Sequence, residues 1–138
     1  MHKNADSPEY YIEYSALGRL FLSSVQLFRK KISDRIQIDE LPIDLHLRKN
    51  VIKMHSLIHD QLRSPKYNDM IRFAWSACGY THEENKFQNV LEINFNDIDL
   101  DCSVADCLEN SFIRCSHCEC VYCMHHFFIE FHSHLSMN

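Results

Sequence analysis

The fold is decided by the last third of the chain, where residues 102–134 read CSVADCLENSFIRCSHCECVYCMHHFFIEFHSH. This stretch holds six of the seven cysteines and five of the ten histidines. Two such residues separated by a short spacer can face one ion, because a tight turn or one helical turn brings their side chains together. Four close pairs therefore predict two zinc sites: Cys102 with Cys107, Cys115 with Cys118, Cys123 with His126, and His132 with His134.

The pairs can be combined around the two ions in more than one way. We prefer an interleaved arrangement, a cross-brace, in which the first pair shares an ion with the third and the second pair with the fourth. Sequential ligation is the alternative, and spacing alone does not exclude it. Three further residues are close enough in sequence to replace a neighbouring ligand: Cys120, His117 and His125.

Disulfide bonds are the competing explanation for so many cysteines. Against them are the odd number of thiols, the polar stretch from Met1 to Tyr10 without a secretory signal, and the histidines among the cysteines. A catalytic zinc would need an open coordination position and an acid-base group, for which Glu119 and Glu130 are near in sequence. The surplus of ligands favours closed structural sites, so we predict a protein that is not an enzyme.

The rest of the composition favours helices. The chain is 46% hydrophobic and contains only two glycines and three prolines, so tight turns are few. Apolar residues recur at three- and four-residue steps over residues 9–33, 43–63 and 65–78, which predicts three helices, with Trp75 expected in the core. Short connections between these helices predict a three-helix bundle over residues 1–80.

The segment between the bundle and the cysteines is predicted to be extended. Residues 81–89 are polar and typical of a linker, and residues 90–100 partly alternate between apolar and polar, which indicates a strand or extended arm. Residues 112–114 are expected to form a short strand and residues 121–135 a helix. The predicted protein is thus mainly α, with a helical bundle at 1–80, a linker or arm at 81–100, and a two-zinc cross-brace module of treble-clef or RING-like type at 101–138.

Charge divides the chain into two unlike halves. Residues 1–80 contain 12 lysines and arginines against 9 acids, whereas residues 81–138 contain only Lys86 and Arg114 against ten acids. A surface that binds phosphates normally needs clustered cations, because the release of counterions drives binding. The cysteine-rich half lacks them. The helical half has a candidate cluster, which is either a phosphate-binding surface or a solvated helix face: Arg29, Lys30, Lys31, Arg35, Arg48, Lys49 and Lys53.

Residues 102–134 resemble the C-terminal cysteine-rich zinc domain of piggyBac-type transposases, a cross-brace module that binds two zinc ions. The matching features are the Cys115-x2-Cys118 knuckle, the following Cys123 and the ending Phe131-His132. This chain departs from that pattern in a wider first pair, more histidines and an acidic module. The resemblance implies a relative of the zinc module that recognises nucleic acid or protein and has no strand-transfer chemistry.

These observations lead to two functional hypotheses. The first is an intracellular zinc-binding adaptor whose acidic module is a platform for a protein partner, with a nuclear location favoured over a cytoplasmic one. The alternative is a regulator, of transposon origin, that binds DNA or RNA through its basic helices. A RING-type ubiquitin ligase is disfavoured, because the central Cys-x-His step is missing. No apolar run approaches the roughly 20 residues of a membrane span, and the oligomeric state is not predicted.

Overall fold

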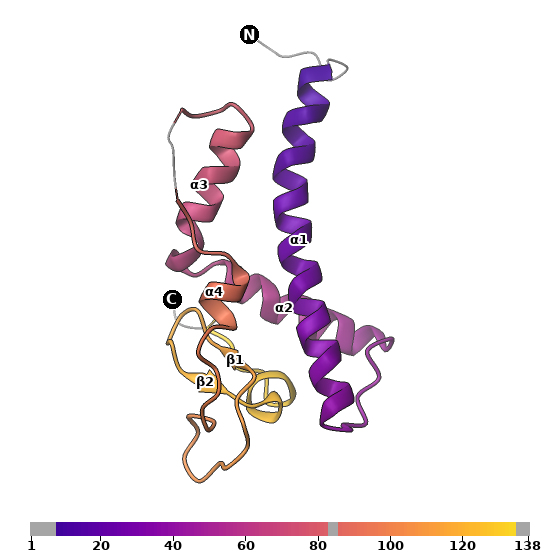
Figure 1. The fold of residues 1–138 in the computed structure, drawn as a ribbon. Helices are drawn as coiled ribbons and strands as arrows, with labels where there is room; N and C mark the ends of the chain where they lie inside the picture. The colour runs from indigo at the N-terminus through magenta and orange to yellow at the C-terminus, as the bar shows by residue number, and fades with distance from the viewer. Residues whose placement is uncertain (1–7, 83–85, 135–138) are drawn as a thin grey trace.

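A computed structural model describes residues 8–82 and 86–134 (Figure 1). The described part is mainly helical, which confirms the mainly α character of the predicted fold class. None of its helices is both long and apolar enough to cross a membrane. In chain order the elements are α1 (Pro8–Ile38), α2 (Arg48–Leu62), η1 (Pro65–Tyr67), α3 (Asn68–Ala77), α4 (Val90–Asn94), β1 (Ile113–Arg114), β2 (Val121–Tyr122) and η2 (His125–Ile129).

Helix α1 contacts each of the other α-helices, α2, α3 and α4. Helix α3 lies alongside α1, while α2 crosses it at a steep angle (Figure 1). This arrangement does not establish the predicted three-helix bundle, because the three helices do not run alongside one another. Helix α2 also begins later than predicted, since Asp44 accepts a hydrogen bond of 2.8 Å from the His46 amide and holds this stretch in a turn.

The prediction of a strand or extended arm at residues 90–100 is wrong over its first half. Residues 90–94 form α4, which begins with a reciprocal capping box. The Asn89 side chain accepts from the Glu92 amide at 3.1 Å, and the Glu92 carboxylate accepts from the Asn89 amide at 2.8 Å. Val90 and Ile93 are buried one helical turn apart. Residues 83–85 of the predicted linker lie outside the described residues.

The cysteine-rich part is built on a two-stranded antiparallel hairpin. Strand β1 pairs with β2 with Ile113 opposite Tyr122, which agrees with the short strand expected at 112–114. The helix expected over residues 121–135 is wrong at both ends, because Val121 and Tyr122 belong to β2 and the helical turn ends at Ile129; residue 135 lies outside the described residues. The next element is η2, a π-helical turn in which the Glu130 amide donates to the His125 carbonyl at 3.0 Å.

One hydrophobic core joins the helical part to the cysteine-rich part. It runs from Phe28 and Ile32 of α1 to Phe112, Phe127 and Phe128, all of which are nearly inaccessible to solvent. The division into a bundle and a separate module therefore remains a prediction that this shared core does not favour.

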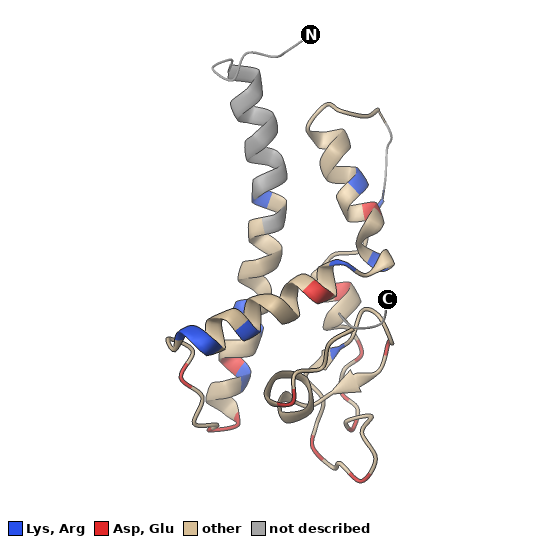
Figure 2. Ribbon diagram, turned by 180° about the vertical axis from the view of Figure 1, so that it is seen from behind, with Lys and Arg blue, Asp and Glu red and all other residues tan. Residues whose placement is uncertain are grey.

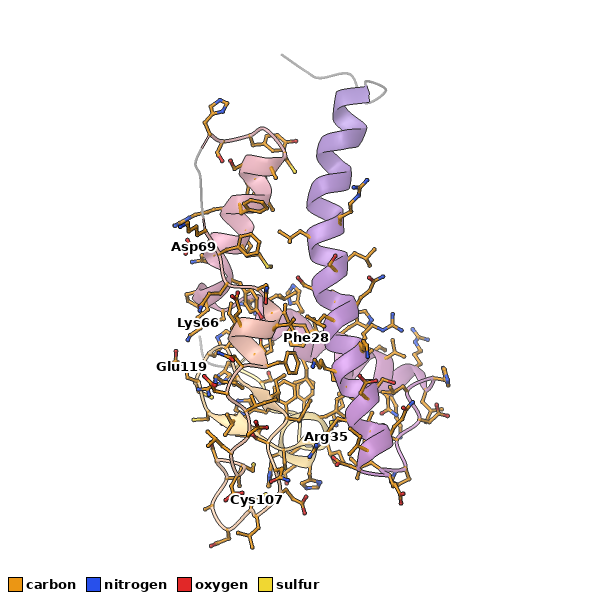
Figure 3. All side chains as sticks on the ribbon, in the orientation of Figure 1. Phe28, Arg35, Lys66, Asp69, Cys107 and Glu119 are labelled. Carbon is orange, nitrogen blue, oxygen red and sulfur yellow. The ribbon has the colours of Figure 1, made fainter. Side chains whose placement is uncertain are left out.

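Polar contacts cross the same boundary. Lys53 donates to the Ile129 carbonyl at 2.6 Å, and Arg35 donates to the Asn110 carbonyl at 3.4 Å. Figure 3 shows Arg35 reaching from α1 toward the cysteine-rich part.

Candidate metal centres

The structure gathers the eight predicted ligands into two groups of four, in the interleaved combination. In the first cluster, the His126 Nδ1 atom lies 3.3 Å from the Cys102 Sγ atom and 3.2 Å from the Cys123 Sγ atom. The Cys107 and Cys123 sulfur atoms are 4.0 Å apart. All four candidate ligand atoms lie within 4.8 Å of one another.

The second cluster is formed by the other two pairs. The Cys115 Sγ atom lies 3.4 Å from the His134 Nε2 atom, and the Cys118 Sγ atom lies 3.6 Å from the His132 Nε2 atom. The two histidine Nε2 atoms are 3.2 Å apart. These four atoms also lie within 4.8 Å of one another, so each cluster offers one complete set of four donors.

The distances fit tetrahedral zinc. Bond lengths of about 2.3 Å to sulfur and 2.0 Å to nitrogen require donor separations of about 3.8 Å between sulfurs, 3.6 Å between sulfur and nitrogen, and 3.3 Å between nitrogens. The six individual separations given above lie within about 0.4 Å of these values, and the other pairs lie within 4.8 Å. The donor chemistry fits as well, because thiolates with imidazoles are the ligands of structural zinc. Both clusters can therefore hold a metal ion, and zinc suits them.

The three alternative ligands lie outside these two groups. The exposed Cys120 thiol faces the Cys118 carbonyl at 3.6 Å. The His117 Nε2 atom lies 2.6 Å from the Asp60 carbonyl oxygen. His125 is exposed, with its Nε2 atom 3.3 Å from a Glu130 carboxylate oxygen. His125, His126 and Glu130 form a third group that could hold a metal, but His126 already belongs to the first cluster.

The cysteine knuckle owes its shape to local backbone hydrogen bonds. The Glu119 amide donates to the Cys115 carbonyl, and the Cys115 amide donates to the Cys120 carbonyl, both at 2.9 Å. This tight path places Glu119 in the left-handed region, with a φ of 63°. Its carboxylate forms an ion pair with Lys66, and Figure 3 shows the two residues side by side. The Lys66 ammonium lowers the pKa of the Glu119 carboxyl.

Local electrostatics prepare some ligands for a metal and oppose others. Burial raises the pKa of the Cys102 thiol, but backbone hydrogen bonds at Cys123 and Val104 outweigh it, so this pKa is lowered overall and the thiolate is favoured. Burial raises the pKa of Cys123 to about 11, so this thiol gives up its proton only to a strong competitor such as a metal. Burial, followed by the neighbouring His132 and His117, lowers the pKa of His134 and keeps it in the neutral form that binds metal.

Several residues around the second cluster were missed by sequence reasoning. Asp60, Gln61 and Ser64, at the end of α2 and just after it, are buried and bonded to the cysteine knuckle. The signal that could have found Gln61 is its position: it falls on the buried stripe of α2, one turn after Leu57, where an apolar residue is expected. A polar residue at such a position needs partners, and the knuckle supplies them.

Comparison with known proteins shows that the cysteine-rich part is similar to a transposase domain. Residues 75–135 match the family model of the Tc5 transposase C-terminal domain. The match indicates a transposase-derived domain, and it names a family other than the piggyBac type suggested by the cysteine spacing. No curated protein and no solved structure matches the chain. The matched range begins within α3 and includes α4, so it is wider than the predicted module.

Proposed function

We propose that this chain is a non-enzymatic, two-zinc domain of transposase origin that associates with nucleic acid. Zinc would be structural, because each cluster already offers four protein donors and leaves no open position for a substrate. Phosphate contact would come from the helical part rather than from the acidic cysteine-rich part. The family match supports this choice between the two hypotheses drawn from the sequence. A domain that contacts chromosomal DNA would act in the nucleus.

The carrying observation is a hollow of about 350 Å³ between α1 and the start of α2. Its lining includes Arg29, Lys30 and Ser33 of α1, together with His46 just before α2. Lysines and arginines lie on both helices, and acids lie on the loops of the cysteine-rich part and also near the end of α1 and in the loop before α2 (Figure 2). Lys30 is paired with Asp34 at 2.9 Å, so the hydrogen-bond donors that the hollow offers to a phosphate group are those of Arg29, Ser33 and His46.

The start of α2 strengthens this argument. Arg48 and Lys49 are exposed in its first turn, which contains no acid, and Leu47 provides no side-chain cap. Cations at a helix N-terminus oppose the helix dipole and cost about 0.3–1 kcal/mol each. An external phosphate would reverse that penalty by satisfying both the cations and the first-turn amides.

The structure also narrows the basic cluster that the sequence suggested. Lys53 is engaged with the Ile129 carbonyl, Arg35 with the Asn110 carbonyl, and Lys31 lies 5.6 Å from the centre of the Phe95 ring. These contacts lie within the molecule and make the three residues poor candidates for phosphate binding. Lys30 is also engaged, because its ammonium pairs with Asp34 at 2.9 Å. The exposed members that remain are Arg29, Arg48 and Lys49.

Charge reversal tests the proposal. The triple variant Arg29→Glu, Arg48→Glu, Lys49→Glu should bind generic duplex DNA far more weakly, and the slope of log affinity against log salt should fall by about 0.9 for each phosphate that is no longer neutralised. The matched control reverses three exposed cations elsewhere, Arg63, Arg72 and Lys86. Fluorescence anisotropy at several salt concentrations measures both. Equal losses of affinity in the two variants would show that only net charge matters, and this would contradict the proposed phosphate-binding surface.

The adaptor hypothesis keeps one specific observation in its favour. Trp75 was expected in the core, but 45% of it is exposed, and it lies beside the exposed Tyr80, with ring centres 5.1 Å apart; Ile71, one turn earlier on α3, is exposed as well. An apolar face of this kind is typical of protein contacts. If it is the functional surface, Trp75→Ser should abolish capture of a protein partner and leave the DNA anisotropy unchanged, whereas the charge-reversed triple variant should do the opposite.

A further inference from the structure

We propose that Gln61 of α2 is a positioning residue of the second metal cluster, where its side-chain amide donates a hydrogen bond to the Cys115 thiolate. The Gln61 Nε2 atom lies 3.4 Å from the Cys115 Sγ atom, and both residues are fully buried. Helix α2 would then be part of the metal site rather than a neighbour of it. This inference rests on the proposed zinc occupancy of that cluster.

The orientation of the Gln61 amide is fixed by its neighbours. The Asn94 Nδ2 atom donates to the Arg114 carbonyl at 2.8 Å, and a carbonyl only accepts, so the nitrogen side of Asn94 is assigned. The same nitrogen donates to the Gln61 Oε1 atom at 2.9 Å, and the Ser116 backbone amide donates to it at 2.7 Å. Two donors require an oxygen there, so the amide nitrogen of Gln61 faces the sulfur of Cys115.

The far end of the network is equally constrained. The hydroxyl of Tyr67 donates to the Asn94 Oδ1 atom, and Tyr67 is completely buried. Burial raises the pKa of the Tyr67 hydroxyl and keeps its proton in place as a donor. The chain of hydrogen bonds therefore runs in one direction, from Tyr67 through Asn94 to the oxygen of Gln61. The amide nitrogen of Gln61 therefore donates to the sulfur of Cys115.

A thiolate is the acceptor that suits this donor. A neutral thiol accepts hydrogen bonds weakly, and a buried N–H group whose bond is poor costs about 1–3 kcal/mol. A metal-bound thiolate is charged and accepts strongly, so the donor and the metal both stabilise the same form of Cys115. The arrangement is thus better satisfied with a metal in place than without one.

The same helix end also holds the other parts of the cluster. Ser116, between the two cysteine ligands, donates from its hydroxyl to the Gln61 carbonyl at 2.8 Å, and its own carbonyl accepts from Ser64 at 2.8 Å. The buried carboxylate of Asp60 accepts from the His134 amide at 3.1 Å. These bonds fix the knuckle and one histidine ligand relative to α2, which is the role of residues behind the ligands in metal sites.

The experiment uses the full chain with two substitutions. Gln61→Met removes the donor and the acceptor while keeping the length, and Gln61→Glu keeps the acceptor but places a carboxylate against the thiolate. We expect the second ion to bind about 10–100-fold more weakly in both variants, with the first ion unaffected. Chelator competition with zinc measures the two affinities, and Gln37→Glu, at an exposed position of α1, is the control.

Cobalt(II) substitution gives a readout that a purely structural role would not change. Loss of an N–H donor raises the energy of the thiolate electrons, so the thiolate-to-cobalt band of Gln61→Met should move to longer wavelength. Equal loss of affinity at both sites, or an unshifted band whatever the affinity, would overturn the assignment of Gln61. If the unmodified chain binds only one ion or none, the proposed zinc occupancy fails as well, and the two failures are distinguishable.

Discussion

The two clusters differ in what surrounds them. With zinc bound, the first cluster has three thiolates and a net charge of −1, whereas the second has two thiolates and is neutral. The first faces a hollow of about 420 Å³ lined by Cys107 and His126 and, across from them, by Arg35 of α1. The second lies against the buried polar network of α2. The charged site thus lies near Arg35, which is itself paired with Asp39 at 3.0 Å, whereas the neutral site is bonded to α2 beside the buried Cys115 and leaves Cys118 exposed.

The largest expected difference comes from removing one ligand at each cluster. Cys115→Ser should release the second ion and leave the buried Gln61 donor without its thiolate acceptor. We expect the free energy of unfolding to fall by more than about 4 kcal/mol. Cys107→Ser should release the first ion with a smaller loss of stability, because Cys107 is half-buried. Zinc content and urea unfolding measure the two effects. A larger loss for Cys107→Ser would reverse the comparison.

The clusters should also respond differently to pH. Zinc binding must displace the proton of Cys123, whose pKa burial raises to about 11, so the affinity of the first site should rise about tenfold per pH unit for that proton alone. At the second site, the pKa of His134 is lowered, so protons compete with zinc for this imidazole only at a lower pH. As the pH is lowered from neutral, the first ion should therefore leave before the second. Cobalt spectra recorded along an acid titration follow this order.

Without metal, the stability of the fold should fall as the pH rises into the alkaline range. A thiol whose folded pKa is raised stabilises the fold below its ordinary pKa, and this contribution is lost as the pH rises through the folded value. For Cys123 that value is about 11, so chelated protein should become less stable as the pH approaches 11. Urea unfolding of chelated protein checks the sign. A gain in stability over that range would contradict it.

A smaller effect is expected where α2 meets the π-helical turn. Lys53 donates to the Ile129 carbonyl at 2.6 Å, and its ammonium lies 5.3 Å from the centre of the Phe128 ring. Lys53→Met keeps the apolar stem and should cost about 1–2 kcal/mol in the free energy of unfolding. The control is Lys49→Met, one turn earlier and exposed, which should change stability by less than about 0.5 kcal/mol. Equal costs would show that the Lys53 interactions do not stabilise the fold.

The smallest effect compares two left-handed residues beside ligands. Asp106 precedes Cys107 with a φ of 62°, and Glu119 follows Cys118 with a φ of 63°. Glycine removes the steric cost of this conformation, about 1 kcal/mol, but it loses more entropy on folding. Because aspartate tolerates the region better than glutamate does, Glu119→Gly should raise the melting temperature slightly more than Asp106→Gly. The exposed ion pair with Lys66 offsets little of this gain.

Spacing along the chain was enough to predict the four close pairs of cysteines and histidines, but not how the pairs combine around two ions. A pair such as Cys115 and Cys118 is brought together by one turn, so its proximity depends on local geometry alone. The shared core and the contribution of α2 are different, because Phe28 and Phe127, or Gln61 and Cys115, are far apart in sequence. Such contacts depend on how the helices pack, which periodicity does not specify.

The wrong prediction at residues 90–94 has a physical reason. Leu91, Ile93 and Phe95 alternate with polar residues, which is typical of a strand, but short apolar runs are ambiguous. The capping box between Asn89 and Glu92 supplied the stronger local signal. Trp75 shows the same limit: an aromatic residue on a helix can face solvent when the neighbouring elements leave that side open.

The π-helical turn at His125–Ile129 connects the two sites along the chain. It begins beside His126 of the first cluster, and the His132 amide of the second cluster donates back to the Phe127 carbonyl at 3.0 Å. An ion in the first cluster therefore pins one end of a rigid turn whose other end delivers His132 and His134. Part of the conformational entropy that the chain must lose to form the second site is then already lost when the second ion binds. Metal loading should consequently be cooperative, with the first ion lowering the concentration of zinc needed for the second.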